Sequence, residues 1–314
     1  MTGHPPLLSI TIPCYRNLAQ ARRCVDTLLA QSFGDFELVL ADDGASHEYR
    51  DYVAALGDPR VRYQRNPERL GAMRNMFQAI TSGTARYTLA FHEDDLLGTH
   101  YLQTAIGILE RHPTVGFVAA QLREFQDEPP ARDLALEPAR PAYELFGSPA
   151  SFLRAILGGL EPMFGSVVYR RAALAGVEPA HDVYGTLVDR PFLLAIMKGW
   201  SAAFVHDPLV WYRHHPDTAR HNGMTAAHIE HLFAHYRSLL PASMSLDDRA
   251  LFYTYSGHWL FRLYDLTPDA QRPPFRRFLF RVWRQGLYQA GWRGRFGLRL
   301  LRRALLGERS VVAP

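Results

Sequence analysis

The first 120 residues alternate short apolar runs with amphipathic stretches, and this alternation constrains the fold more than any other feature of the chain. The apolar runs have the length and composition of buried strands, and the stretches between them repeat apolar residues with helical spacing. Strands separated by helices in this way predict a parallel sheet with helices on both faces. The expected strands are 8–13, 36–41, 61–64, 86–91 and 115–120, and the expected helices are 19–30, 47–56, 72–81 and one that Thr99 caps and that ends near Arg111.

The rest of the chain divides into a weaker α/β pattern and a helical region. A loop rich in proline and acidic residues is expected at 126–141, a helix at 149–157, a strand at 166–169, a helix at 186–198, and short strands at 202–206 and 209–213. After about Met224 the pattern is helical throughout. The sequence therefore predicts an α/β domain over 1–223 and a helical, arginine-rich region over 224–314.

Acidic clusters follow two of the predicted strands. Asp42-Asp43 comes after the second strand, and Glu93-Asp94-Asp95 follows the strand at 86–91. Ligands of open parallel sheets bind beyond the carboxyl ends of the strands, and adjacent carboxylates repel one another unless a cation offsets their charge. Because Mg²⁺ and Mn²⁺ bind carboxylate oxygens, the clusters predict a divalent-cation site. The alternative is a turn with helix-capping carboxylates and a solvated helix entry.

Composition narrows the setting in which the chain works. Cys14 and Cys24 are the only cysteines among 314 residues, too few for a disulfide framework, which favours a reducing, cytoplasmic location. The first residues lack the pattern of a secretion signal, and no apolar segment is long enough to span a bilayer. From Arg272 onward the chain carries many arginines and one acidic residue, Glu308. That asymmetry indicates an anionic partner for this region.

Four ordered blocks resemble a known family. The segments 11–17 (TIPCYRN), 41–46 (ADDGAS), Asn66 through Gly71 to Asn75, and 91–95 (FHEDD) resemble the family 2 glycosyltransferases of the GT-A fold, of the bacterial polysaccharide or lipopolysaccharide type. The resemblance implies a Rossmann-like, mostly parallel sheet flanked by helices. It also implies metal-dependent, inverting transfer of a sugar from a nucleotide diphosphate donor to a hydroxyl of a saccharide or lipid-linked acceptor, in cell-surface glycan assembly.

The resemblance also implies roles for individual residues on the donor side. It places Pro13, Tyr15 and Asn17 at the nucleotide pocket, Asp43 on the base, Asp42 on the nucleoside, and Arg74 and Asn75 near the phosphates or the sugar. Asp94 would ligate Mg²⁺ or Mn²⁺, Asp95 would orient the sugar or support the metal, and Glu93 would lie in the same donor site. The family's signature begins with aspartate where this chain has His92, which can hydrogen-bond ribose or ligate a metal.

Two later segments resemble the family's acceptor and leaving-group blocks. Inverting transfer requires a base that deprotonates the acceptor hydroxyl, and the segment 185–199 implies Asp189 in that role, with Asp182 as the second candidate. Val188 stands where the family usually has an acidic residue. The segment 211–216 (WYRHHP) implies that His215 reaches the metal or the diphosphate and that Arg213 offsets the charge of the leaving group.

Other interpretations remain open at this stage. The arginine-rich helices of the C-terminal region either dock on an anionic membrane, on the inner face of the cell membrane, or pack on the catalytic domain; nucleic-acid binding is not expected, since no known module accompanies the charge. His92 and Val188 keep open a catalytically inactive relative that binds a nucleotide or a partner. A dinucleotide oxidoreductase or a nucleotidyltransferase would need a glycine-rich turn after the first strand, where this chain has Pro13-Cys-Tyr-Arg.

Overall fold

The computed structural model describes residues 4–44, 47–126, 129, 131–135, 141–214, 225–266, 276, 277 and 280. The chain forms two compact units. Unit 1 consists of Met1–Phe152, Glu161–Pro179 and Phe192–His214, and unit 2 consists of Leu153–Leu160, Ala180–Pro191 and His215–Pro314. Two short segments of the central chain therefore belong with the helical C-terminal part, so the units are interleaved in sequence.

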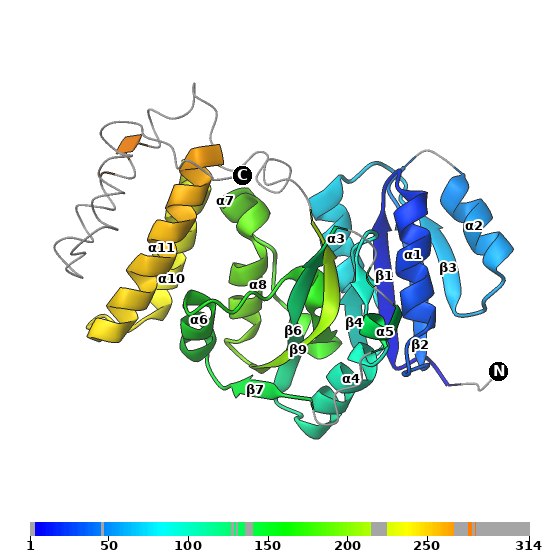
Figure 1. The fold of residues 1–314 in the computed structure, drawn as a ribbon, viewed down its shortest axis with the longest axis horizontal. Helices are drawn as coiled ribbons and strands as arrows, with labels where there is room; N and C mark the ends of the chain where they lie inside the picture. The colour runs from blue at the N-terminus through cyan, green and yellow to red at the C-terminus, as the bar shows by residue number, and fades with distance from the viewer. Residues whose placement is uncertain are drawn as a thin grey trace. The chain divides into compact units, whose positions relative to one another are not determined.

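Unit 1 is built on a nine-stranded mixed sheet (Figure 1). The strand order is β3-β2-β1-β4-β8-β6-β9-β5, and β7 pairs with β9. The strands are β1 (Leu8–Cys14), β2 (Phe36–Asp42), β3 (Val61–Arg65), β4 (Tyr87–Ala90), β5 (Leu96–Leu97), β6 (Val115–Phe125), β7 (Tyr143–Phe146), β8 (Val168–Arg170) and β9 (Ser201–Arg213). The run β3-β2-β1-β4 is parallel throughout, and β6 pairs with β9 in parallel. The carboxyl ends of β1, β2 and β4 therefore lie at one edge.

Helices cover this sheet and bury its apolar side chains. Unit 1 contains α1 (Leu18–Leu29), α2 (Glu48–Leu56), α3 (Ala72–Thr81), α4 (Tyr101–Arg111) and the short α5 (Ala131–Leu134). Helix α1 buries Ala21, Cys24, Val25 and Leu28, a spacing that places all four on one face, and these side chains share a core with β1, β2 and β4. Strand β1 is buried along nearly its whole length, as expected for a strand covered on both faces.

The remaining helices lie in unit 2 or cross its borders in sequence. They are α6 (Pro149–Leu157), α7 (His181–Tyr184), α8 (Asp189–Ile196), α10 (Ala226–Leu239) and α11 (Leu246–Leu266), with the 3-10 turn η3 (Gly185–Leu187). The 3-10 turns η1 (Phe164–Ser166) and η2 (Arg171–Leu174) belong to unit 1. Among the helices that the structure describes, none has both the length and the apolar character that crossing a bilayer requires. Most of the arginine-rich segment lies outside the described residues.

The predicted α/β class is confirmed, with local differences. The sequence predicts two strands at 202–206 and 209–213, because Asp207-Pro208 interrupts the apolar pattern. The structure has the single strand β9, in which Val205 pairs with Ala120 and Val210 with Leu122, so that a bulge takes up the intervening residues. Thr99 is not the cap of α4, since that helix begins after His100. Strands β5 and β7 and helix α5, which lies in the predicted loop, were too short to give a pattern.

Candidate active site

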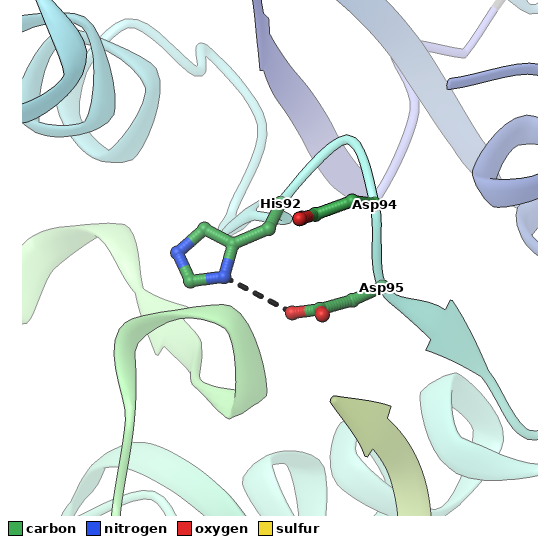
Figure 2. Close-up of side chains that lie close together, drawn as sticks. All are labelled: His92, Asp94 and Asp95. Carbon is green, nitrogen blue, oxygen red and sulfur yellow. Dashed lines mark hydrogen bonds and ion pairs between the residues drawn. The ribbon is translucent and has the colours of Figure 1, made fainter. Parts of the chain in front are cut away.

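Three side chains on the connection from β4 to β5 form a group suited to a metal ion. One ligand atom of each of His92, Asp94 and Asp95 lies within 4.8 Å of the others. Figure 2 shows both carboxylates extending from this connection toward the His92 ring. His92 and Asp94 are partly exposed, whereas Asp95 is buried. The second acidic cluster of the sequence, Glu93-Asp94-Asp95, predicts a cation site here. The group contains two of its carboxylates, and the imidazole of His92 takes the place of Glu93.

Asp95 is held in place by two hydrogen bonds. Its Oδ2 is hydrogen-bonded to His92 Nδ1 at 3.0 Å, and its Oδ1 accepts the backbone N–H of Arg213 at 2.9 Å. Burial raises the pKa of Asp95, while the hydrogen bond to His92 and the charge of that ring act in the opposite direction. Both oxygens are therefore engaged within the protein, which suits a side chain that orients the group.

Arg213 reaches this loop from 118 positions later in the chain. Antiparallel pairing of Leu96 with Trp211 brings the end of β9 beside the start of β5. The Arg213 side chain then donates from Nε to the carbonyl oxygen of Asp94 at 3.1 Å, and its guanidinium lies 4.6 Å from the centre of the Phe125 ring. The resemblance implies that Arg213 offsets the charge of the leaving group, and this role stays a prediction. His215 lies outside the described residues.

Glu93 points away from this group and toward the loop that follows β1. Its two carboxylate oxygens each lie 3.1 Å from the backbone N–H of Tyr15, and its Oε2 accepts the Tyr49 hydroxyl at 2.6 Å. Burial raises the pKa of Glu93, while the hydrogen bonds from Tyr49 and Tyr15 lower it. The carboxylate therefore connects the β4–β5 loop to the β1–α1 loop, so two of the four sequence blocks are in direct contact.

The first acidic cluster holds the loops beside β2. Asp42 is fully buried, with Oδ1 accepting the N–H of Gly44 and Oδ2 accepting the Tyr63 hydroxyl. Asp43 accepts from Asn66 Nδ2 at 3.0 Å and from the N–H groups of Leu70 and Gly71 at 2.7 and 2.8 Å. The largest influence on the pKa of Asp43 is burial, which raises it, but these hydrogen bonds and the charge of Arg69 together lower it below its usual value.

The third block forms a buried network of carboxamides. Asn66 donates to Asn75 Oδ1, Gln78 donates to Asn66 Oδ1, and Asn75 Nδ2 donates to the carbonyl of Ala41. Asn75 is buried and its carboxamide is engaged at both ends, whereas Arg74 is exposed on the first turn of α3. The structure therefore places Asn75 within the scaffold and Arg74 at the surface.

Tyr15, the aromatic residue expected at the nucleotide base, lies among cations. The guanidinium groups of Arg69 and Arg16 are 4.5 and 5.2 Å from the centre of its ring. Pro13 and Asn17 flank this loop, Pro13 at the end of β1 and Asn17 at the N-cap of α1. A partly exposed ring near two guanidinium groups suits a planar, anionic ligand such as a nucleotide.

The acceptor-side candidates belong to unit 2. Asp189 begins α8 and accepts the N–H of Arg190 at 2.8 Å, and Asp182 is exposed on α7 beside His181. Val188, at the position where an acidic residue is expected, is buried. Gly185 has a φ of +56°, and a Cβ there would lie 2.6 Å from His228 Nδ1, so glycine is required between α7 and η3. The role of Asp189 as the base, and that of Asp182 as the second candidate, remain predictions.

The family model of glycosyl transferase family 2 matches residues 9–172, slightly more than half of the chain and all four donor-side blocks. The chain belongs to glycosyl transferase family 2. It is accordingly a nucleotide-sugar glycosyltransferase. A relative from Mycobacterium tuberculosis, an uncharacterized protein, is 31% identical over 222 residues, which are 67% of this chain and 67% of that protein. For the next two relatives, the aligned part covers 33% and 18% of the relative's own length.

Solved structures share the fold of this family 2 enzyme. S. aureus TarS in complex with UDP-GlcNAc superposes with a TM-score of 0.57 at 15% identity, over 88% of this chain and 80% of TarS. The mannosyltransferase PcManGT from Pyrobaculum calidifontis, in complex with GDP-Man and Mn²⁺, gives a TM-score of 0.53 at 16% identity, over 97% of this chain and 81% of PcManGT. At this identity the likeness establishes the GT-A fold, which confirms the predicted fold class.

The donor atoms of this glycosyltransferase fit a divalent cation. Two carboxylates and an imidazole converge, and these are ligand types that Mn²⁺ accepts and that Mg²⁺ accepts in part. Gly165 lies against the group: a Cβ there would be 3.1 Å from His92 Nδ1 and 3.4 Å from Asp95 Oδ2. Sequence reasoning missed Gly165, Tyr49 and Arg69. Gly165 and Tyr49 lie outside the family's blocks, and Arg69 lies inside the third block without a role that the resemblance names, so none gives a signal until the fold brings it to the site.

Proposed function

We propose that this glycosyltransferase transfers a sugar, with inversion and with the help of a divalent cation, from a nucleotide diphosphate sugar to an acceptor hydroxyl. The observation that carries the proposal is the convergence of His92, Asp94 and Asp95 at the carboxyl end of β4. Since β1 and β2 run parallel to β4, their loops meet the same edge of the sheet. The hydrogen bonds from Tyr15 to Glu93 support a single site that includes both loops.

A Mn²⁺ or Mg²⁺ ion in this site would neutralise the charge that builds up on the departing diphosphate. Asp94 is proposed as the main carboxylate ligand, with the His92 ring beside it. Asp95 orients His92 and receives the backbone N–H of Arg213, so it positions the group. The guanidinium of Arg213 adds positive charge on the leaving-group side. His215 is proposed as a further contact to the metal or the diphosphate.

The donor is proposed to lie across the β1–α1 loop. Tyr15 would stack on the base, and Asp43 would set the position of residues 66–71 that border the pocket. Arg69 and Arg74 would lie near the phosphates. Because TarS binds UDP-GlcNAc and PcManGT binds GDP-Man, uridine and guanosine diphosphate sugars are the first donors to test.

On the acceptor side we propose Asp189 as the base that removes the hydroxyl proton, with Asp182 as the second candidate. The acceptor is proposed to be a saccharide or a lipid-linked saccharide of the cell surface. An acceptor carried on a lipid agrees with the arginine-rich C-terminal sequence, which would dock on the anionic inner face of the membrane. The division at residue 224 is retained as a proposal for where this region begins.

A thermal-shift screen tests the proposal. UDP, GDP, CDP, dTDP and ADP are each added with EDTA, with MgCl₂ or with MnCl₂, to the wild-type chain and to Asp94→Asn. We expect one nucleotide to raise the melting temperature only when a metal is present, and the increase to disappear in Asp94→Asn. Arg62→Gln, an exposed change on β3 away from the loops, serves as the control. If no nucleotide stabilises the chain under any condition, the result contradicts the proposed function and favours the inactive relative that binds a partner.

A further inference from the structure

The middle residue of the FHEDD block has a place that the family resemblance does not explain. Glu93 lies between His92 and Asp94 in sequence, yet its carboxylate accepts from two donors in another part of the site, the Tyr15 N–H, which both oxygens share, and the Tyr49 hydroxyl. N–H and O–H donors are the partners of an ionised carboxylate. The side chain is therefore a fixed link between the loop with the metal-site residues and the loop with Tyr15.

A second link runs in parallel through Tyr49 of α2. Its hydroxyl donates to Glu93 and accepts the backbone N–H of Asn17 at 2.8 Å. Tyr49 is fully buried, and burial raises its pKa, which keeps the hydroxyl protonated as a donor. One carboxylate thus controls two backbone N–H groups of the β1–α1 loop, that of Tyr15 directly and that of Asn17 through Tyr49.

The residue between these two anchored N–H groups is strained. Arg16 has a φ of +55°, and among the described residues it is the one non-glycine residue with positive φ. Left-handed backbone at such a residue persists only where the surroundings impose it. The hydrogen bonds at Tyr15 and Asn17 hold the backbone on both sides of Arg16.

The other face of the metal-site loop is also held by the β1–α1 segment. Cys24 of α1 donates from its thiol to the carbonyl oxygen of His92 at 3.3 Å. A shift of His92–Asp95 therefore cannot occur without a change in the contacts of α1 and of the loop before it. The hydrogen bonds of Glu93 and Cys24 thus join the two segments directly.

We propose that Glu93 is a positioning residue which, with Tyr49, couples the nucleotide-binding loop to the metal-binding loop, so that a nucleoside diphosphate and a divalent cation each strengthen the binding of the other. The inference rests on the proposed function, since it assumes that Tyr15 contacts the nucleotide and Asp94 the metal. Coupling of this kind is reciprocal, and its usual size is about 5- to 150-fold. It would give the enzyme a donor site that binds each of its two ligands more tightly when the other is present.

The experiment compares Tyr49→Phe and Glu93→Gln with the wild-type chain. Tyr49→Phe keeps the ring and deletes only the hydroxyl that joins Glu93 to Asn17. Tyr52→Phe is the matched control: it makes the same deletion on the same helix, and the Tyr52 hydroxyl has no hydrogen-bond partner among the described residues. Isothermal titration calorimetry gives the Kd of UDP and of GDP with EDTA and with saturating MnCl₂, and the ratio of the two Kd values measures the coupling. Binding of Mn²⁺ alone is followed by electron paramagnetic resonance.

We expect a coupling ratio of about tenfold or more in the wild-type chain, and a ratio at least about threefold smaller in Tyr49→Phe and Glu93→Gln. Tyr52→Phe should keep the wild-type ratio. Mn²⁺ binding without nucleotide should change little in Tyr49→Phe, since the metal-site side chains are untouched. A merely structural role would lower the melting temperature and leave the ratio unchanged.

Two different failures can be told apart. If the wild-type chain binds neither nucleotide with or without Mn²⁺, the proposed function is wrong, and the coupling falls with it. If the wild-type chain binds a nucleotide with metal-dependent affinity and both variants keep the full ratio, the proposed function stands and the positioning role of Glu93 is overturned. Should Glu93→Gln fail to fold, Tyr49→Phe alone decides, because it retains the carboxylate.

Discussion

Asp43→Asn is the perturbation whose effect follows most directly from the geometry. The carboxylate accepts from Asn66 and Leu70 on Oδ1 and from Gly71 on Oδ2. Asparagine can keep an oxygen toward the first two donors, but its amide nitrogen then faces the N–H of Gly71, a donor against a donor. One charge-assisted hydrogen bond is lost and one partly buried N–H is left without an acceptor. Together these cost about 2 to 3 kcal/mol of stability.

The pH dependence of this loss has a defined sign. The pKa of Asp43 is lowered in the folded protein, so the folded state binds the proton less tightly than the unfolded chain. The ionised group stabilises the fold above its unfolded pKa of about 3.9, and this stability disappears as the pH falls through the lower, folded pKa. Asparagine does not titrate. The difference in unfolding free energy between wild type and Asp43→Asn should therefore be full near neutral pH and shrink below about pH 4.

Urea denaturation at several pH values measures the difference, and hydrogen exchange of the peptide covering residues 66–75 shows where it acts. Faster exchange at Leu70 and Gly71 is expected in the variant, by roughly 30- to 150-fold for 2 to 3 kcal/mol. Glu68→Gln, an exposed change in the same loop, is the matched control. Equal protection of these N–H groups in wild type and Asp43→Asn, or a difference that grows as the pH falls, would refute the reasoning.

Three further predictions concern single residues of the two units. Gly165→Ala places a methyl group 3.1 Å from His92 Nδ1 and should weaken Mn²⁺ binding roughly three- to tenfold with the melting temperature preserved; unchanged Mn²⁺ affinity by paramagnetic resonance would contradict the close approach. Arg170→Met removes a buried guanidinium that donates to the carbonyls of Leu109, His112 and Val115, and should cost about 3 kcal/mol in urea unfolding; a loss below about 1 kcal/mol would mean that water replaces it. Asp189→Asn should lower kcat by about 10²- to 10⁴-fold while the Kd of the donor stays within about twofold, measured by product formation and calorimetry; wild-type turnover would place the base elsewhere.

Sequence patterns predicted the first half of the fold well because its central strands β1, β2 and β4 are parallel and almost wholly buried. Strand β1 and helix α1 carry continuous or periodic apolar residues that report burial directly. The elements that the sequence missed are short or depend on pairing: β5 has two residues, and it exists because Leu96 and Leu97 pair with Trp211 and Val210 of a distant strand. No local pattern specifies such a partner.

The sequence predicted where the site lies. It did not predict which of the site residues bind a ligand and which hold the loops in place. Asp42, Asp43 and Asn75 belong to the family's blocks, and the blocks alone suggest contacts with the donor. In the structure their polar atoms accept from or donate to the protein itself, as with Asp42 toward Gly44 and Tyr63. A family motif shows where a carboxylate stands in the sequence. It does not distinguish a carboxylate that holds a loop from one that binds a ligand.

The difference between carboxylates that hold loops and carboxylates that bind ligands also changes the evidence for a metal ion at this site. Three consecutive carboxylates at 93–95 suggest a cation because their charges repel. The structure offsets much of that charge without one, because Glu93 turns to Tyr15 and Tyr49, and Asp95 turns to His92 and to the N–H of Arg213. The repulsion is therefore weak evidence for a metal in this chain. The stronger evidence is the geometry that remains: these contacts hold an imidazole nitrogen and two carboxylate oxygens within 4.8 Å of one another. A preorganised cation site requires that the protein itself hold its ligands in place. Here protein contacts hold Glu93 and Asp95, and Asp94 is the carboxylate proposed to face a ligand.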